Sequence, residues 1–186
     1  MELELSPDKI AALAQRIDRP IVLVGMMGVG KTSVGRRLAA LLQLPFIDAD
    51  DEIVQAAQMS IAEMFEQYGE AYFRNGERRV IARLVEGGRG VIATGGGAFV
   101  NPDTRAMILA KGIAVWLDSD IDALIERVGR NSNRPLLRGG DPREILTRLK
   151  AERESAYAQA PIHVKSGQGP HSRAVHQVLK ELDAWL

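Results

Sequence analysis

Eight consecutive residues near the start of the chain have the types and spacing needed to hold phosphate groups. The segment Gly25-Met-Met-Gly-Val-Gly-Lys-Thr32 fits the pattern G-x-x-x-x-G-K-[ST] at every fixed position. Glycines let main-chain N–H groups turn toward a β-phosphate, and the N-terminus of a following helix adds its positive dipole end. We expect Lys31 to contact the β- and γ-phosphates and the Thr32 hydroxyl to bind Mg²⁺. The segment therefore predicts a P-loop that binds ATP with Mg²⁺, through Gly28, Val29, Gly30, Lys31, Thr32 and Ser33.

Two carboxylates follow at the end of the next apolar run, in Pro45-Phe-Ile-Asp-Ala-Asp50. If this run is a strand, its alternation puts Asp48 and Asp50 on one side, at the edge where open α/β sheets bind ligands. Asp48 is then a candidate for the Mg²⁺ site, and Asp50 is a candidate to accept a proton from a substrate hydroxyl. The alternative is that these acidic residues only begin a helix.

Two further segments could contact a substrate. Gly95-Gly96-Gly97 offers main-chain N–H groups without side chains, although it also fits a simple flexible turn. Arg134, in the aperiodic stretch 129–142, could close over the site and stabilise the charge of the transferred phosphoryl group. It could also be an ordinary solvated loop arginine.

Arginines in two predicted helices are harder to interpret. Arg74 follows Tyr72-Phe73 in an amphipathic segment, and Arg153 lies in Lys150-Ala-Glu-Arg-Glu154. The charged neighbours of Arg153 at helical spacing favour a solvent-facing position on the residues alone.

The elements that must position these residues alternate between apolar runs and amphipathic stretches, which predicts an α/β fold with a parallel sheet. Ser6-Pro7 predicts a helix start, and Ser60-Ile-Ala-Glu63 a capping box. The expected strands are 20–25, 45–50, 90–94, 113–117 and 162–165. The expected helices are 6–17, 31–42, one from 60, 70–85, 102–111, 120–128, 142–157 and 173–185. We expect one domain over 1–186, with residues 1–19 as a helical extension and 129–142 as a lid.

Composition narrows the function classes. The 186 residues include no Cys, which excludes disulfides and thiolate metal sites, and the formal net charge is zero, which gives no reason to expect nucleic acid or a membrane surface as partner. No apolar run is long enough to cross a bilayer, and the N-terminus does not resemble a signal peptide. We expect a cytoplasmic, monomeric protein.

The P-loop can be assigned further by exclusion. The chain contains no Asn-Lys-x-Asp motif, which a GTPase would carry, and it is too short for a motor or transporter ATPase. A small kinase of the nucleoside-monophosphate-kinase type remains, with a small-molecule acceptor that the residues alone do not identify.

The ordered set of motifs resembles the shikimate kinase family. The set consists of the P-loop, Asp48-Ala-Asp50, Phe73-Arg74 with Glu77, Gly95-Gly96-Gly97, Arg134-Pro-Leu-Leu137, and Arg153 followed by Tyr157. The resemblance implies a five-stranded parallel sheet in the order 2-3-1-4-5. It also implies phosphorylation of the 3-hydroxyl of shikimate by ATP, a step toward the aromatic amino acids.

The resemblance also assigns roles by position. Asp50 would bind the reacting hydroxyl, and Arg74 and Arg153 would bind the shikimate carboxylate, which reverses the solvent-facing interpretation of Arg153. Gly95, Gly96 and Gly97 would line the acceptor pocket. Arg134 would act from the lid with Lys31 as catalytic partner, Thr32 and Asp48 would serve Mg²⁺, and Arg127 with Pro170 would flank the adenine.

Two alternatives stay open at this point. One is a kinase of the same architecture that acts on gluconate or a nucleotide. The other is a regulatory module that binds a small molecule without turnover.

Overall fold

A computed structural model describes residues 5–130 and 135–186. Within them, five strands form one parallel sheet in the order β2-β3-β1-β4-β5, as expected from the sequence. The strands are β1 (Ile21–Val24), β2 (Phe46–Asp48), β3 (Val91–Ala93), β4 (Ile113–Asp118) and β5 (Ile162–Lys165).

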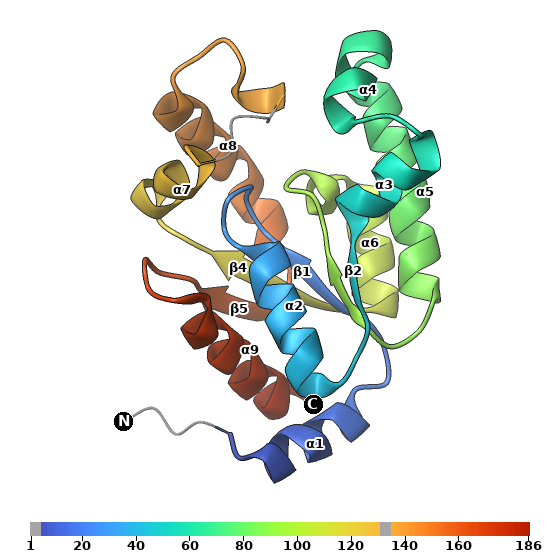
Figure 1. Ribbon diagram of the computed structural model, residues 1–186, viewed down its shortest axis with the longest axis vertical. Coiled ribbons are helices and arrows are strands. Elements are labelled where there is room, and N and C mark those ends of the chain that lie inside the picture. Colours follow the sequence, from blue (N-terminus) through green and yellow to red (C-terminus); the bar gives the residue numbers. More distant parts are fainter. Residues whose placement is uncertain (1–4, 131–134) are drawn as a thin grey trace.

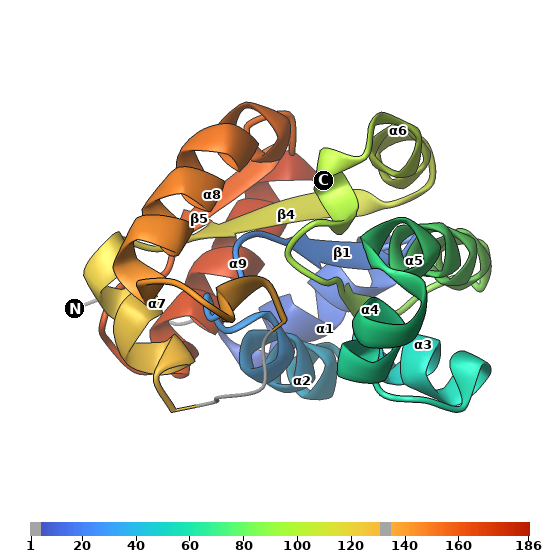
Figure 2. The same ribbon diagram turned by 90° about the horizontal axis from the view of Figure 1, so that it is seen from above.

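Helices connect the strands and cover both faces of the sheet. They are α1 (Pro7–Arg16), α2 (Lys31–Leu42), α3 (Ala49–Ala57), α4 (Ile61–Tyr68), α5 (Glu70–Glu86), α6 (Pro102–Lys111), α7 (Ile121–Val128), α8 (Pro142–Tyr157) and α9 (His171–Trp185), with short 3-10 helices η1 (Ala98–Val100) and η2 (Pro135–Leu137). Seen from above, α1 and α2 lie on one side of the sheet, and α6 and α8 lie on the other (Figure 2). No helix in the described part of the chain is long and apolar enough to cross a membrane.

The centre of the sheet is buried, and its strands β1 and β3 carry no polar side chain. Every residue of β1 has an exposed fraction of 0%, and it pairs with β3 on one side and β4 on the other. In such a sheet the strand order reverses at β1, and ligands bind outside the carboxyl ends of the strands at that point. The P-loop follows β1 directly. Above it, α3 and α4 rise on one side and α7 and α8 on the other (Figure 1).

The N-terminal helix α1 packs on this body through its apolar face. Leu13 and Ile17 are each 1% exposed. Arg89, just before β3, donates from Nε to the carbonyl of Ile17 at 2.7 Å and from Nη2 to the carbonyl of Ala14, which satisfies the end of the helix. Arg16 also pairs with Asp183 of α9 at 2.6 Å.

Most expected boundaries are confirmed within two or three residues, including the capping box between Ser60 and Glu63. One element was not expected: residues 45–50 were assigned to a strand and residues 51–59 to no element, whereas β2 ends at Asp48 and the helix α3 covers Ala49–Ala57. The final helix begins at His171, two residues before its expected start, and the aperiodic stretch contains η2.

Candidate functional site

The P-loop has the strand–loop–helix setting that its sequence predicted. It leaves β1 at Val24 and enters α2 at Lys31, and Gly30 adopts a φ of 99°, which favours glycine. A Cβ on Gly30 would also lie 2.8 Å from Cε1 of His171, at the start of α9. Glycine is therefore required here by both backbone conformation and close packing.

Lys31 lies at the floor of a polar cavity of about 350 Å³. Its Nζ donates to the carbonyls of Gly25 at 2.6 Å and Met26 at 2.9 Å, and the side chain is only 8% exposed. The expected nucleotide residues that line this cavity are Gly28, Gly30, Lys31, Thr32, Ser33 and Arg127. Val29 instead has a buried side chain, and its carbonyl accepts a hydrogen bond from Arg127 at 2.9 Å.

The two residues expected to serve a metal are in contact. Thr32 Oγ1 donates to Asp48 Oδ2 at 2.8 Å, and Asp48 Oδ1 accepts from the main-chain N–H of Asp50 at 2.9 Å. Asp48 thus caps α3 and also lines the P-loop cavity, so both sequence interpretations of this residue apply. Oxygen donors in small number suit Mg²⁺, which usually keeps water and phosphate ligands. The described residues hold no group of three or more His, Cys, Asp or Glu side chains that could bind a metal ion.

Arg127 lines the P-loop cavity, and Arg127 and Pro170 lie together in a neighbouring cavity. Arg127 bridges two loops, since its second nitrogen donates to the carbonyl of Gly167 at 2.8 Å, and both residues line a smaller cavity of about 230 Å³. His171 lines the same space. Burial lowers the pKa of His171, and the nearby positive charges of Arg127 and Arg37 lower it further, which favours a neutral imidazole beside the P-loop.

A second cavity, of about 140 Å³, lies beside the first and mixes charged and apolar walls. Its charged side chains are Asp50, Arg74, Glu77 and Arg153. Its apolar wall consists of Met27, Ile61, Phe65, Phe73, Pro135 and Leu136. Such a cavity fits a small ligand that carries both an apolar face and an anionic group.

Arg153 is buried in this cavity, so the solvent-facing interpretation of its helical spacing was wrong. The residue is 7% exposed, and its Nη1 has no hydrogen-bond partner among the described residues. A buried guanidinium nitrogen without a partner is costly unless a ligand supplies one. This observation points to an anionic group on the ligand.

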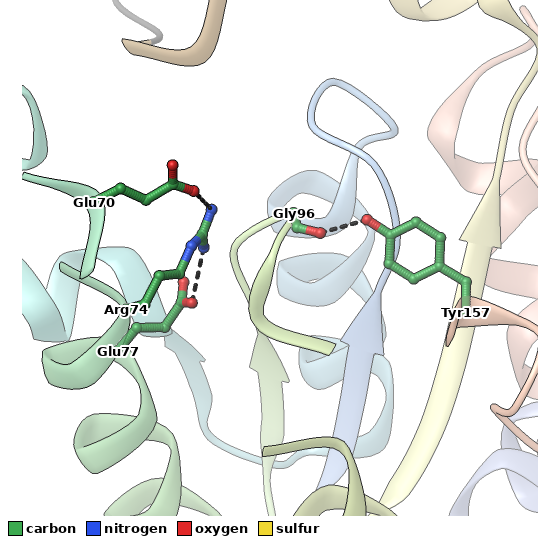
Figure 3. A network of polar contacts seen from close by, with 5 residues as sticks. All are labelled: Glu70, Arg74, Glu77, Gly96 and Tyr157. Carbon is green, nitrogen blue, oxygen red and sulfur yellow. Dashed lines mark hydrogen bonds and ion pairs between the residues drawn. The ribbon is translucent and has the colours of Figure 1, made fainter. Parts of the chain in front are cut away.

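Arg74 faces the same cavity from α5 and is held by carboxylates (Figure 3). It contacts Glu77 at 2.9 Å and Glu70 at 3.4 Å. Glu77 is 3% exposed. Its pKa is raised, chiefly by burial and also by the charge of Asp50, while Arg74 and Arg153 oppose the shift. Glu77 therefore orients Arg74 but keeps one carboxylate oxygen, Oε2, without a partner among the described residues.

Each glycine of Gly95-Gly96-Gly97 lies close against other groups of the cavity. A Cβ on Gly95 would lie 2.9 Å from Glu77 Oε2, and one on Gly96 would lie 3.2 Å from Arg153 Nη1. A Cβ on Gly97 would lie 2.5 Å from three atoms of the Arg74 guanidinium. The segment is therefore a tight wall of the cavity rather than a flexible turn, and η1 follows it directly.

Asp50 stands where the two cavities meet. It lines both, together with Met27, Gly95 and Gly96. Our strand argument for its position was wrong, because β2 ends at Asp48 and Asp50 lies in the first turn of α3. The two residues still serve the same site, because the main-chain N–H of Asp50 donates to Asp48 and both residues line the P-loop cavity.

The segment expected to be a lid contributes to the acceptor side. Pro135 and Leu136 line the 140 Å³ cavity, and Arg138 pairs with Glu66 of α4 at 2.7 Å. Arg134, the expected lid arginine, lies outside the described residues.

The sequence analysis missed several residues of the site. Glu77 was seen only as part of a motif, although a carboxylate three residues after Arg74 could have suggested a pair. Ile61 and Phe65 of the apolar wall, and His171, have no motif signal. Met27, Phe73, Pro135 and Leu136 lie within the quoted motifs but were given no role in an apolar wall. Tyr157 was noted without a role.

Comparisons with known proteins agree with this geometry. A family model described as shikimate kinase matches residues 27–183. The shikimate kinase of Novosphingobium aromaticivorans is 63% identical over 98% of this chain and 96% of its own length, and that of Bradyrhizobium diazoefficiens is 50% identical over 100% and 89%. A solved structure of shikimate kinase from Acinetobacter baumannii in complex with shikimate covers 94% of this chain and 96% of its own, with 34% identity and a TM-score of 0.86.

The match extends over almost the whole chain, including the P-loop and both cavities. The chain therefore belongs to the shikimate kinase family, whose reaction is the ATP-dependent phosphorylation of shikimate.

Proposed function

We propose that this chain transfers the γ-phosphoryl group of ATP to the 3-hydroxyl of shikimate, with the P-loop cavity as nucleotide site and the 140 Å³ cavity as acceptor site. The observation that carries the proposal is that Asp50 lines both cavities. A hydroxyl bound beside Asp50 would face the end of the P-loop, as transfer between the two sites requires.

In this mechanism the acceptor hydroxyl oxygen attacks the γ-phosphorus, and the bond from that phosphorus to the bridging oxygen of ADP breaks. Asp50 takes or orients the hydroxyl proton. Lys31 leaves its carbonyl partners for the phosphate oxygens and stabilises their charge. Arg134 would add positive charge from the lid.

Substrate position depends on an anion site opposite Asp50. The guanidinium groups of Arg74 and Arg153 would bind the shikimate carboxylate, and Gly96 and Gly97 would offer main-chain N–H groups. The unpartnered, buried Nη1 of Arg153 supports this assignment.

Thr32 and Asp48 would hold Mg²⁺, which supplies positive charge to the phosphates when bound. Arg127 and Pro170 would flank the adenine.

We further propose that the enzyme is monomeric and cytoplasmic and consists of one domain. In this domain, residues 1–19 are an N-terminal extension and residues 129–142 are a lid.

A coupled assay of ADP release with a panel of acceptors tests the proposal. Shikimate should turn over, whereas gluconate and nucleoside monophosphates should not. Turnover of gluconate or a nucleotide without shikimate would identify a different kinase. Binding of shikimate with no turnover of any acceptor would instead identify a sensor module.

A further inference from the structure

Tyr157, the last residue of α8, is a buried side chain that the mechanism above does not use. It is 1% exposed, and its ring packs against Trp116 of β4 with centroids 5.8 Å apart. Its hydroxyl donates a hydrogen bond to the carbonyl of Gly96 (Figure 3). A tyrosine at the end of α8 thus contacts the main chain of the glycine loop that lines the acceptor cavity.

This contact fixes the direction of a peptide group. The Gly96–Gly97 peptide bond is trans, and in a planar trans peptide the carbonyl and the following N–H point in opposite directions. With the Gly96 carbonyl turned to Tyr157, the N–H of Gly97 points away from Tyr157. In Figure 3, Arg74 lies on that other side of the loop. The position that a Cβ on Gly97 would occupy also lies against the Arg74 guanidinium, which agrees with this placement of Arg74.

Such a peptide needs an anchor because it has glycine on both sides. Glycine has little steric restriction on φ and ψ, so a peptide between two glycines can rotate at low cost. A rotation that reversed the group would turn a carbonyl, rather than an N–H, toward the cavity. The carbonyl would repel an anionic ligand.

We propose that Tyr157 is a positioning residue for the acceptor: its hydroxyl holds the Gly96–Gly97 peptide so that the Gly97 N–H donates to the acceptor carboxylate beside Arg74 and Arg153. The inference rests on the proposed function, since it requires a carboxylate in this cavity. It adds a role for a residue that itself does not touch the substrate.

The chemical state of Tyr157 suits this role. Burial raises the pKa of its hydroxyl, and the positive charge of Arg153 and a hydrogen bond with that side chain oppose the shift only in part. The hydroxyl therefore stays protonated near neutral pH and can donate to the Gly96 carbonyl.

The test is Tyr157→Phe, which keeps the ring packing and removes only the hydroxyl. We expect KM for shikimate to rise about tenfold, because a tenfold change corresponds to the free energy of about one hydrogen bond. KM for ATP should not change. Tyr68→Phe is the matched control, because it makes the same chemical change at a side chain that is 54% exposed. An unchanged KM for shikimate, or an equal rise for both substrates, would overturn the inference.

A substrate change tests whether Tyr157 acts through the carboxylate-binding part of the cavity. The ratio of kcat/KM between wild type and Tyr157→Phe should fall toward one for a shikimate analogue whose carboxylate is replaced by a hydroxymethyl group. A ratio that stays near ten would mean that Tyr157 acts on something other than the carboxylate.

A third measurement needs no variant. The Gly97 amide resonance of the wild-type protein should move downfield on addition of shikimate, and an unmoved resonance would contradict the inference. Failure of the proposed function is distinguishable, because then wild-type protein would not phosphorylate shikimate at all.

Discussion

The two cavities of this molecule recognise their ligands by different means. In the nucleotide cavity, one continuous segment supplies more lining residues than any other part of the chain, namely Met27, Gly28, Gly30, Lys31, Thr32 and Ser33. The acceptor cavity is built by side chains from α3, α4, α5, η2 and α8 around the glycine loop. The first site therefore depends on local backbone conformation, and the second depends on how distant elements pack.

This difference determines what a substitution will do. Changes in the P-loop should damage phosphoryl transfer whichever acceptor is present. Changes in the acceptor cavity should affect shikimate and leave ATP binding intact. Three substitutions test this division, and a fourth tests the charge state of a carboxyl group in the acceptor cavity.

The largest effect is expected from Lys31→Ala. Because the lysine charge stabilises the transferring phosphoryl group, kcat should fall about a hundred- to a thousandfold. Steady-state kinetics with shikimate and ATP measures this fall in kcat. The control is Lys180→Ala, because Lys180 is an exposed lysine on α9. A kcat near that of wild type would remove Lys31 from the mechanism.

Arg153→Ala should affect the acceptor selectively. Loss of a charge-assisted hydrogen bond to a carboxylate should lower kcat/KM for shikimate about ten- to a hundredfold while KM for ATP stays the same. Arg148→Ala is the matched control, because Arg148 lies on the same helix with a side chain 65% exposed. Equal weakening of both substrates would break the proposed division between the cavities.

Gly97→Ala should have a smaller effect of the same kind. The added methyl group would displace the Arg74 guanidinium, so KM for shikimate should rise at least about fivefold. Gly76→Ala makes the same change within α5, where no atom lies within 4 Å of the added Cβ. It should instead raise the melting temperature by about 2–4 °C, since alanine favours a helix by about 1 kcal/mol over glycine. Similar kinetic defects in the two variants would show that the Gly97 contact is unimportant.

The smallest effect concerns pH. Because the pKa of Glu77 is raised in the folded protein, the folded state binds more protons than the unfolded state between the two pKa values. Stability from this group is therefore present at low pH and is lost as pH rises through the folded value. Glu77→Gln should reduce this loss, which melting temperatures of both proteins from pH 4 to 8 would reveal. Parallel curves would contradict the raised pKa.

The sequence predicted the strand–loop–helix setting of the P-loop because its requirements are local. Glycine spacing, a preceding apolar strand and a following helix are all visible within about a dozen residues. The sheet order came from the family resemblance rather than from the pattern of strands.

Side chains placed by packing were harder to predict. The spacing of Arg153 is the same for a solvent-facing and a buried arginine, so only the resemblance pointed inward. Asp50 was assigned to the correct region with the wrong element, because a three-residue strand followed at once by a helix has no clear periodicity. The contact of Tyr157 with Gly96 joins residues 61 positions apart, which no local pattern records.

The attachment of α1 has a practical consequence for anyone who trims this protein. The family match begins at residue 27, downstream of both α1 and the central strand β1. A truncation at that boundary would delete the middle of the sheet. Even a cut after residue 17 would uncover the apolar surface that Leu13 and Ile17 now shield and would leave Arg89 without its carbonyl partners. Shortened versions should therefore begin no later than Ser6.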